Sequence, residues 1–308
     1  MNKRLLLVSF FFLLITIRGN AQKVVFEGLK DINGTQLYFK VIGEGEPLLI
    51  VHGGPGLNHN YFLPHLNNLA KKYQLIFYDQ RSAGQSALNV KADMNLNTFA
   101  RDIEAIRVAF NIDKLNILCH SWGALPVTNY ALSYPEHLGC IIYCNPAPLS
   151  NENSRTIAAL AAERETPADS IEKAALRALP GFQKGDMQIV NAMMRISFRE
   201  VFCDTSKVSQ LDPKLPDNYL VASLSLYGLM DDMKSYNYYS SMSSVHVPVL
   251  ILHGDCDITP LGMDQLLQKA IPGSQLVEFK HSGHFPFIEE NKKFTKTVEA
   301  FLKSSAAH

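Results

Sequence analysis

The stretch LNILCHSWG, residues Leu115–Gly123, decides how this chain folds. Its apolar first half predicts a buried strand, and residues Ala124–Leu132 have the composition of a helix. A strand that turns sharply into a helix through Ser-x-Gly lifts the hydroxyl of Ser121 clear of the backbone, an arrangement called a nucleophile elbow. Gly123 fits this turn because a side chain there would crowd the packing of helix against strand. The usual motif begins with glycine, and Cys119 stands in its place, so the interpretation depends on the flanking sequence.

Composition limits the possible classes of protein. The chain has 308 residues, of which 47% are hydrophobic and 19% charged, as expected for a globular protein with one large domain or one domain carrying an insertion. Its formal net charge is zero, which argues against a nucleic acid or an anionic membrane as partner. Nothing in the sequence indicates an oligomeric state.

The first 21 residues have the pattern of a secretory signal peptide. Lys3 and Arg4 precede an apolar run, Leu5–Ile17, and Gly19–Ala21 resembles a cleavage site. A run of about 13 residues is shorter than the ~20 that a membrane helix needs, although an uncleaved anchor is the alternative. We therefore expect export to the periplasm or the medium, with no stable membrane insertion after cleavage.

The cysteines do not suggest a disulfide framework. There are five, an odd number, so at least one is unpaired within the chain. Cys140 and Cys144 fall on one expected strand, which separates them by about 13 Å, too far for a bridge. No Cys-x-x-Cys occurs, so we expect buried thiols and no metal site at Cys119, Cys140, Cys144, Cys203 and Cys256.

Strand and helix signals alternate along most of the chain. Residues 23–41 resemble a β-hairpin around Asn33-Gly34 at a sheet edge. Further strands are expected at Pro47–Val51, Tyr73–Tyr78, Leu138–Cys144, Val247–Leu252 and Gln275–Phe279, and helices at Thr98–Phe110, Asp264–Ala270 and Glu289–Leu302. This alternation predicts an α/β fold with a mostly parallel sheet covered by helices on both faces.

Residues 147–244 interrupt the alternation. Their segments Ser154–Glu165, Ile171–Leu179, Asp186–Phe202 and Tyr219–Met230 are helical in composition, and none resembles a buried strand. We therefore predict a helical cap at 147–244, inserted into a core formed by residues 22–146 and 245–308.

A serine nucleophile needs a base, and the base needs an acid to orient it. Two polar clusters follow late strands, where a parallel sheet places its functional loops. Asp257 is preferred to Asp255, which follows its strand directly and suits a turn, and His284 is preferred to His281 at the loop start. Ser121, Asp257 and His284 are thus the expected catalytic triad, with no cofactor and no metal.

The oxyanion of such a reaction needs fixed N–H donors. One candidate is the backbone N–H of Trp122, just after the nucleophile. The other comes from the loop His52-Gly53-Gly54-Pro55-Gly56, where Pro55 has no N–H. We expect Gly54 to donate, with Gly53 as the second choice.

Three motifs together resemble the proline iminopeptidase branch of the α/β-hydrolases. They are HGGPG, then Asp79-Gln80-Arg81 before a small loop and Ser86, then HSWG. The resemblance covers nearly the whole mature chain and implies an α/β-hydrolase fold with the triad and cap named above. Ser82 replaces a glycine usual in the second motif, and Cys119, His120 and Ala124 depart from the usual elbow sequence.

The resemblance also implies cap carboxylates that bind the free amine of a peptide, usually near a tryptophan. The single tryptophan of this chain is in the elbow. Glu200 is the tentative substrate-binding residue, with a solvated helix carboxylate as the alternative; Asp231 and Asp232 are weaker candidates. The function predicted is an exported serine aminopeptidase acting on short peptides, the alternatives being an esterase or other small-molecule acyl hydrolase, and a non-catalytic binding protein.

Overall fold

The computed structural model describes residues 23–306, so the predicted signal peptide lies outside the described part of the chain. Eight strands form one sheet in the order β1-β2-β4-β3-β5-β6-β7-β8. The strands are β1 (Val24–Ile32), β2 (Thr35–Ile42), β3 (Glu46–Val51), β4 (Tyr73–Tyr78), β5 (Leu115–His120), β6 (Leu138–Cys144), β7 (Val249–Gly254) and β8 (Gln275–Phe279).

The sheet is mostly parallel, as predicted. β1 and β2 form the expected hairpin, in which Ile32 pairs with Thr35 across a two-residue turn. Asn33 and Gly34 have φ of 47° and 76°, as the favoured hairpin turn requires. β2 also pairs antiparallel with β4, and the other five pairings are parallel.

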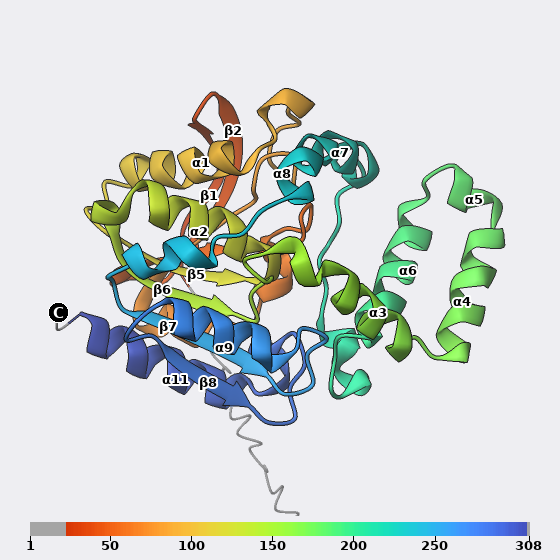
Figure 1. Cartoon of the computed structure of the whole chain (residues 1–308). Helices are drawn as coiled ribbons and strands as arrows, with labels where there is room; N and C mark the ends of the chain where they lie inside the picture. Colours follow the sequence, from red (N-terminus) through yellow and green to blue (C-terminus); the bar gives the residue numbers. More distant parts are fainter. Residues whose placement is uncertain (1–22, 307–308) are drawn as a thin grey trace, which may run out of the picture.

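Helices cover both faces of the sheet (Figure 1). α1 (Leu96–Ala109), α2 (Ala124–Ser133) and α9 (Leu261–Ala270) pack on one face, and α11 (Asn291–Ser305) on the other, following the short α10 (Pro286–Glu289). The strand β3 explains why the sequence has continuous apolar runs, because Leu49 and Val51 are buried on the first face while Leu48 and Ile50 are buried on the second.

The chain between β6 and β7 is helical, and its residues 154–199 lie past the carboxyl ends of the strands, at the right of Figure 1. It contains α3 (Ser154–Arg164), α4 (Pro167–Ala178), α5 (Pro180–Gln183), α6 (Met187–Arg199), α7 (Tyr219–Ser225) and α8 (Met230–Lys234). Within residues 145–248 the only β-type pairing is an isolated bridge between Ser150 and Asn237. Of the helices between residues 23 and 306, none is long and apolar enough to cross a membrane.

Two segments of the cap differ most from the sequence prediction. α4 begins at Pro167, four residues before the expected start, because Thr166 and Asp169 form a reciprocal capping box with proline in the first turn. The single helix expected at Tyr219–Met230 is divided into α7, a 3₁₀ turn at Leu226–Leu229, and α8. Gly228 lies in that turn so close to residue 91 that a Cβ would be 2.0 Å from the Lys91 carbonyl oxygen.

The expectation of buried thiols is correct for three cysteines and wrong for two. Cys119, Cys140 and Cys144 are free and buried. Cys203 and Cys256 form a disulfide across a separation of 53 residues. The bond joins the cap to the loop after β7, a proximity that spacing in the sequence does not reveal.

Candidate active site

Ser121 occupies the predicted sharp turn between β5 and α2. Its φ is 54°, a left-handed conformation that is uncommon for a residue with a side chain and is typical of a strained elbow. A Cβ on Gly123 would be 2.7 Å from the His52 carbonyl oxygen, so only glycine fits where the helix passes the end of β3. Cys119 is fully buried and fills the place of the usual first glycine.

Asp257 and His284 meet at the carboxyl ends of β7 and β8. The Nδ1 atom of His284 lies 2.8 Å from Oδ2 of Asp257, whose side chain is fully buried. Burial raises the pKa of Asp257, but the charge and hydrogen bond of His284 outweigh it, with help from the donors of Asn145 and Thr259. The pKa is lowered to about 2, so the carboxylate is ionised at neutral pH and holds the imidazole from one side.

Asn145 also belongs to this cluster, although sequence reasoning did not identify it. It follows β6 directly and has φ of 43°. Its Nδ2 donates to Oδ2 of Asp257 at 2.5 Å and to the Gly283 carbonyl at 3.3 Å. The signal was available, since a polar residue directly after a buried parallel strand is at the functional edge of the sheet.

The two rejected alternatives lie elsewhere. Asp255 is on the surface, and its Oδ1 accepts the Ser282 N–H at 3.3 Å. His281 is exposed at the start of its loop with φ of 59°. Both residues therefore shape the loops that carry Asp257 and His284.

The glycine loop after β3 lies against the elbow. A Cβ on Gly53 would be 2.9 Å from Cβ of Ser121, which no other residue could tolerate without a shift. Gly54 has φ of 137°, also suited to glycine. Trp122 is buried and packs edge-to-face on Phe99, with ring centroids 5.3 Å apart, which fixes the residue that follows Ser121.

Ser121 and His284 line one hollow of about 260 Å³, which Gly53 and Gly54 also line. The cap lines one side of this hollow, through Ser197 and Phe198 near the end of α6. The complete set of lining residues is Gly53, Gly54, Leu57, His120, Ser121, Ser197, Phe198, Val201, His284 and Phe285. Base and cap thus enclose a small, mostly apolar space above the serine.

The three cap carboxylates proposed from sequence do not line this hollow. Glu200 follows α6, and its Oε1 accepts from Nζ of Lys173 on α4 at 2.7 Å. Asp232 accepts the N–H of Leu96 at the start of α1, and Asp231 is exposed beside Lys234. In this structure all three are committed to contacts within the cap or between cap and base.

The cap is attached beside His284. The N–H of His284 donates to the Val201 carbonyl at 2.8 Å. The buried carboxylate of Glu289 accepts the N–H groups of Cys203 and Asp204, each at 2.9 Å, and of Gly283 at 2.6 Å. Burial raises the pKa of Glu289, while these N–H donors act in the opposite direction. A single side chain therefore binds both the cap segment and the loop that carries His284.

One group of potential metal ligands occurs in the described chain. Cys203, Asp255 and Cys256 have ligand atoms within 4.8 Å of one another. The two sulfurs are bonded to each other, so neither is a thiolate that could hold an ion.

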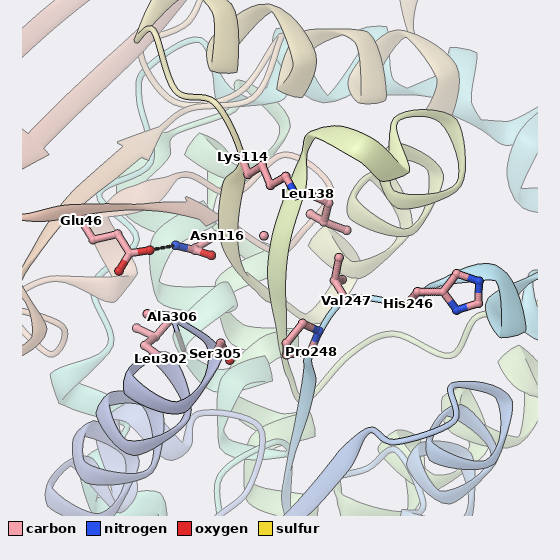
Figure 2. Close-up of a pocket in the computed structure, with 11 residues that line it drawn as sticks. Glu46, Lys114, Asn116, Leu138, His246, Val247, Pro248, Leu302, Ser305 and Ala306 are labelled. Carbon is pink, nitrogen blue, oxygen red and sulfur yellow. Dashed lines mark hydrogen bonds between the residues drawn. The ribbon is translucent and has the colours of Figure 1, made fainter. Parts of the chain in front are cut away.

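A second hollow, of about 370 Å³, lies at the opposite end of the sheet (Figure 2). It is lined by the beginnings of strands, with Glu46 of β3 accepting a 2.7 Å hydrogen bond from Asn116 of β5. Its charged side chains, Glu46 and Lys114, are exposed, as is His246. Its lining contains no serine held in a sharp turn and no histidine–carboxylate pair.

Comparison with known proteins agrees with this geometry. A family model described as "alpha/beta hydrolase fold" matches residues 46–291. The chain belongs to this family. It is similar to a proline iminopeptidase of Clostridium botulinum (strain Hall), with 26% identity over 295 residues that cover 91% of this chain and 99% of the relative. These findings make the chain a hydrolase.

Solved structures show the same fold. The proline iminopeptidase of Mycobacterium smegmatis gives a TM-score of 0.68 at 20% identity, covering 92% of this chain and all (100%) of the other. An esterase from Exiguobacterium antarcticum gives 0.66 at 21% identity, with coverage of 90% and 100%.

Proposed function

We propose that this α/β-hydrolase is a serine hydrolase that forms an acyl-enzyme on Ser121. The observation that carries the proposal is the shared hollow: Ser121 at a left-handed turn and His284, held by the buried Asp257, line the same space. A nucleophile, a base and an orienting acid drawn from three distant parts of the chain are the components of acyl transfer by serine.

The reaction follows from these positions. His284 donates its Nδ1 proton to Asp257 in a hydrogen bond, which leaves Nε2 free to take the proton of Ser121 as the hydroxyl attacks the substrate carbonyl. The backbone N–H groups of Gly54 and Trp122 bind the oxyanion. The imidazolium then protonates the leaving group, and water, activated by the same histidine, releases the acyl group.

The substrate class we propose is the N-terminal residue of short peptides. Curated proline iminopeptidases 25–28% identical to this chain, over nearly the full length of both, support it. The hollow of about 260 Å³ suits an acyl group the size of one small residue such as proline or alanine.

Hydrolysis of small esters is the second candidate, favoured by one specific observation. A free amine needs a carboxylate, and the hollow described above is lined by none, since Glu200 is paired with Lys173. In the aminopeptidase account a cap carboxylate binds the amine, and Glu200 is our first candidate for it, whereas in the esterase account Glu200 has no contact with substrate.

We further propose export, because Lys3 and Arg4, the apolar run to Ile17 and the small residues up to Ala21 form a signal-peptide pattern. The Cys203–Cys256 disulfide supports it, since such bonds persist in oxidising compartments. N-terminal sequencing of the protein from a fractionated native host tests the proposal. An N-terminus at Gln22 in the exported fraction is expected; an intact Met1 in the cytosol contradicts it.

One panel separates the two substrate classes. The purified protein is given prolyl and alanyl chromogenic amides with free and with N-acetylated amines, beside short acyl esters. An aminopeptidase prefers the free amines, and Glu200→Gln raises KM for them; an esterase prefers the esters, and Glu200→Gln leaves KM unchanged. Ser121→Ala must abolish whichever activity is found, and residual turnover at the parent rate would overturn the serine mechanism.

A further inference from the structure

Gly53, the residue before the proposed oxyanion donor, is held through both of its backbone polar groups. Its N–H donates to the hydroxyl of Tyr61 at 2.5 Å. Its carbonyl oxygen lies 2.7 Å from Nδ1 of His52. The Tyr61 hydroxyl is in turn 2.9 Å from Nδ1 of His120, so two histidines act on one glycine.

The contacts of His52 fix its tautomer. Nε2 faces the backbone N–H of Gln80 at 3.0 Å, and because an N–H can only donate, Nε2 carries no proton. The ring is then neutral, and Nδ1 carries the proton that the Gly53 carbonyl accepts. The side-chain amide nitrogen of Gln80 lies 3.2 Å from Nδ1, and it donates to the His52 carbonyl at 2.7 Å. Because this nitrogen can only donate, it cannot accept the Nδ1 proton in place of the Gly53 carbonyl.

His120 is held in the opposite tautomer. Its Nε2 lies 2.8 Å from the carbonyl oxygen of His284, which can only accept, so Nε2 carries the proton. Burial lowers the pKa of His120 well below its usual value, so Nδ1 is bare and accepts from Tyr61. Burial also lowers the pKa of His52, to about 4, which agrees with a neutral ring.

The peptide between Gly53 and Gly54 is the unit that these contacts orient. Only Gly54–Pro55 and Leu63–Pro64 are cis among the described peptide bonds, so Gly53–Gly54 is trans. In a trans peptide the C=O and the N–H point in opposite directions. A proton donor on Gly53 O therefore also sets the direction of the Gly54 N–H.

We propose that His52 and His120, held as opposite neutral tautomers, are positioning residues that clamp Gly53 and thereby preorganise the Gly54 N–H for the oxyanion. His120 couples this clamp to the proposed base, because its Nε2 proton binds the carbonyl of His284 and the two rings lie 4.7 Å apart. His52 also connects the two fingerprint motifs, since it begins HGGPG and binds Gln80 of DQR. The inference rests on the proposed function and names the groups that align its oxyanion site.

Amide side chains offer a test that distinguishes the tautomers. Asn places a polar atom near the position of histidine Nδ1, and Gln places one near Nε2. His52 must donate from Nδ1, so His52→Asn should retain more activity than His52→Gln. His120 must donate from Nε2, so the order reverses, and His120→Gln should retain more than His120→Asn.

The poorer variant at each position should lose roughly 10²-fold in kcat with KM little changed, because oxyanion donors act in the transition state. The better variant at each position should have a kcat about tenfold higher than that of the poorer variant. The same order at both positions, or losses confined to KM, would overturn the clamp. A general packing defect predicts no such reversal, and thermal unfolding of all four variants records any common loss of stability.

Two further measurements keep the test decisive. Imidazole ¹⁵N shifts of the unmodified protein at neutral pH should report a protonated Nδ1 at His52 and a protonated Nε2 at His120, and the opposite tautomer at either site refutes the proposal. Tyr61→Phe, which removes only a hydroxyl, should lower kcat by about tenfold, and an unchanged kcat also counts against it. Labelling of Ser121 by a fluorophosphonate is scored separately, so the clamp can fail while the serine mechanism stands.

Discussion

Two hollows at opposite ends of the sheet offer a comparison, and the larger of the two is not the better candidate. The hollow at the beginnings of the strands has about 370 Å³, against about 260 Å³ at their carboxyl ends. In Figure 2, the polar groups at the larger one stand apart, with His246 on the far side of the view from the Glu46–Asn116 pair. At the smaller one, buried groups hold each other in fixed positions, as Asp257 holds His284.

The difference teaches that preorganisation identifies a reactive site better than volume does. Ionised groups in fixed orientations are costly to bury unless they have partners, and the buried carboxylate of Asp257 has two, His284 and Asn145. Exposed side chains around an open hollow require no such arrangement. The predictions below compare matching substitutions at the two ends, or neighbouring residues of one loop.

The largest effect is expected from removing a hydroxyl. Ser121→Ala should lower kcat by roughly 10⁵-fold, because the nucleophile is lost while binding remains. Ser305→Ala, the same change at the other hollow, should leave kcat/KM within about twofold of the parent, since its hydroxyl bonds to the Phe301 carbonyl in its own helix. Steady-state kinetics on the best substrate of the panel provide the comparison. Equal effects of the two variants would remove the distinction between the ends.

The next largest effect is expected within one loop. Asp257→Asn should lower kcat roughly 10⁴-fold, because an amide that donates to His284 favours the wrong tautomer of the base. Asp255→Asn should change kcat less than about threefold, since its carboxylate is at the surface and bonds the Ser282 N–H. A loss at position 255 as large as that at 257 would refute the assignment of the acid.

The lowered pKa of Asp257 also predicts a dependence of stability on pH. Its folded pKa of about 2 lies below the unfolded value of 3.8, so its contribution is present above about pH 4 and is lost as pH falls through 2. The contribution amounts to about 2 kcal/mol of unfolding free energy. Urea unfolding of the parent and Asp257→Asn should show their difference shrinking between pH 5 and pH 2. A difference that stays constant over this range would contradict the lowered pKa.

The smallest effect compares two asparagines that each donate to a carboxylate. Asn145 donates to buried Asp257 at 2.5 Å, and Asn116 donates to exposed Glu46 at 2.7 Å. Asn145→Ala should lower kcat roughly tenfold, because a buried charged acceptor loses a donor that water cannot replace. Asn116→Ala should leave kcat unchanged. If the two variants have equal kcat, Asn145 does not position the acid.

The sequence predicted the base of the molecule well because its signals are local. β4, β6 and β8 begin and end at the expected residues, since each is a short apolar run between polar loops. The elbow at Ser121 was readable because one strand, one turn and one helix specify it. The choice of Asp257 over Asp255 followed from where a strand ends, and the structure brings the former to His284.

What the sequence did not predict depends on contacts between distant segments. The Cys203–Cys256 bond joins residues that neither spacing nor composition relates. The partner of Glu200 is Lys173 on another cap helix, so the orientation of α4 against α6 decides what that carboxylate does. The position of Asn145 directly after a strand could be predicted from the sequence, but no motif marks this residue. Its contact with Asp257 depends on the pairing of β6 with β7.

The central claim is that Ser121 is the nucleophile. A fluorophosphonate probe, followed by digestion and mass spectrometry of the labelled peptide, tests it most directly. We expect one label per chain, on Ser121, with labelling strongly reduced in His284→Ala and unaffected in Ser305→Ala. A folded parent protein that carries the label on another residue would contradict the account. One that takes no label would contradict it too, and would restore the hypothesis of a non-catalytic binding protein.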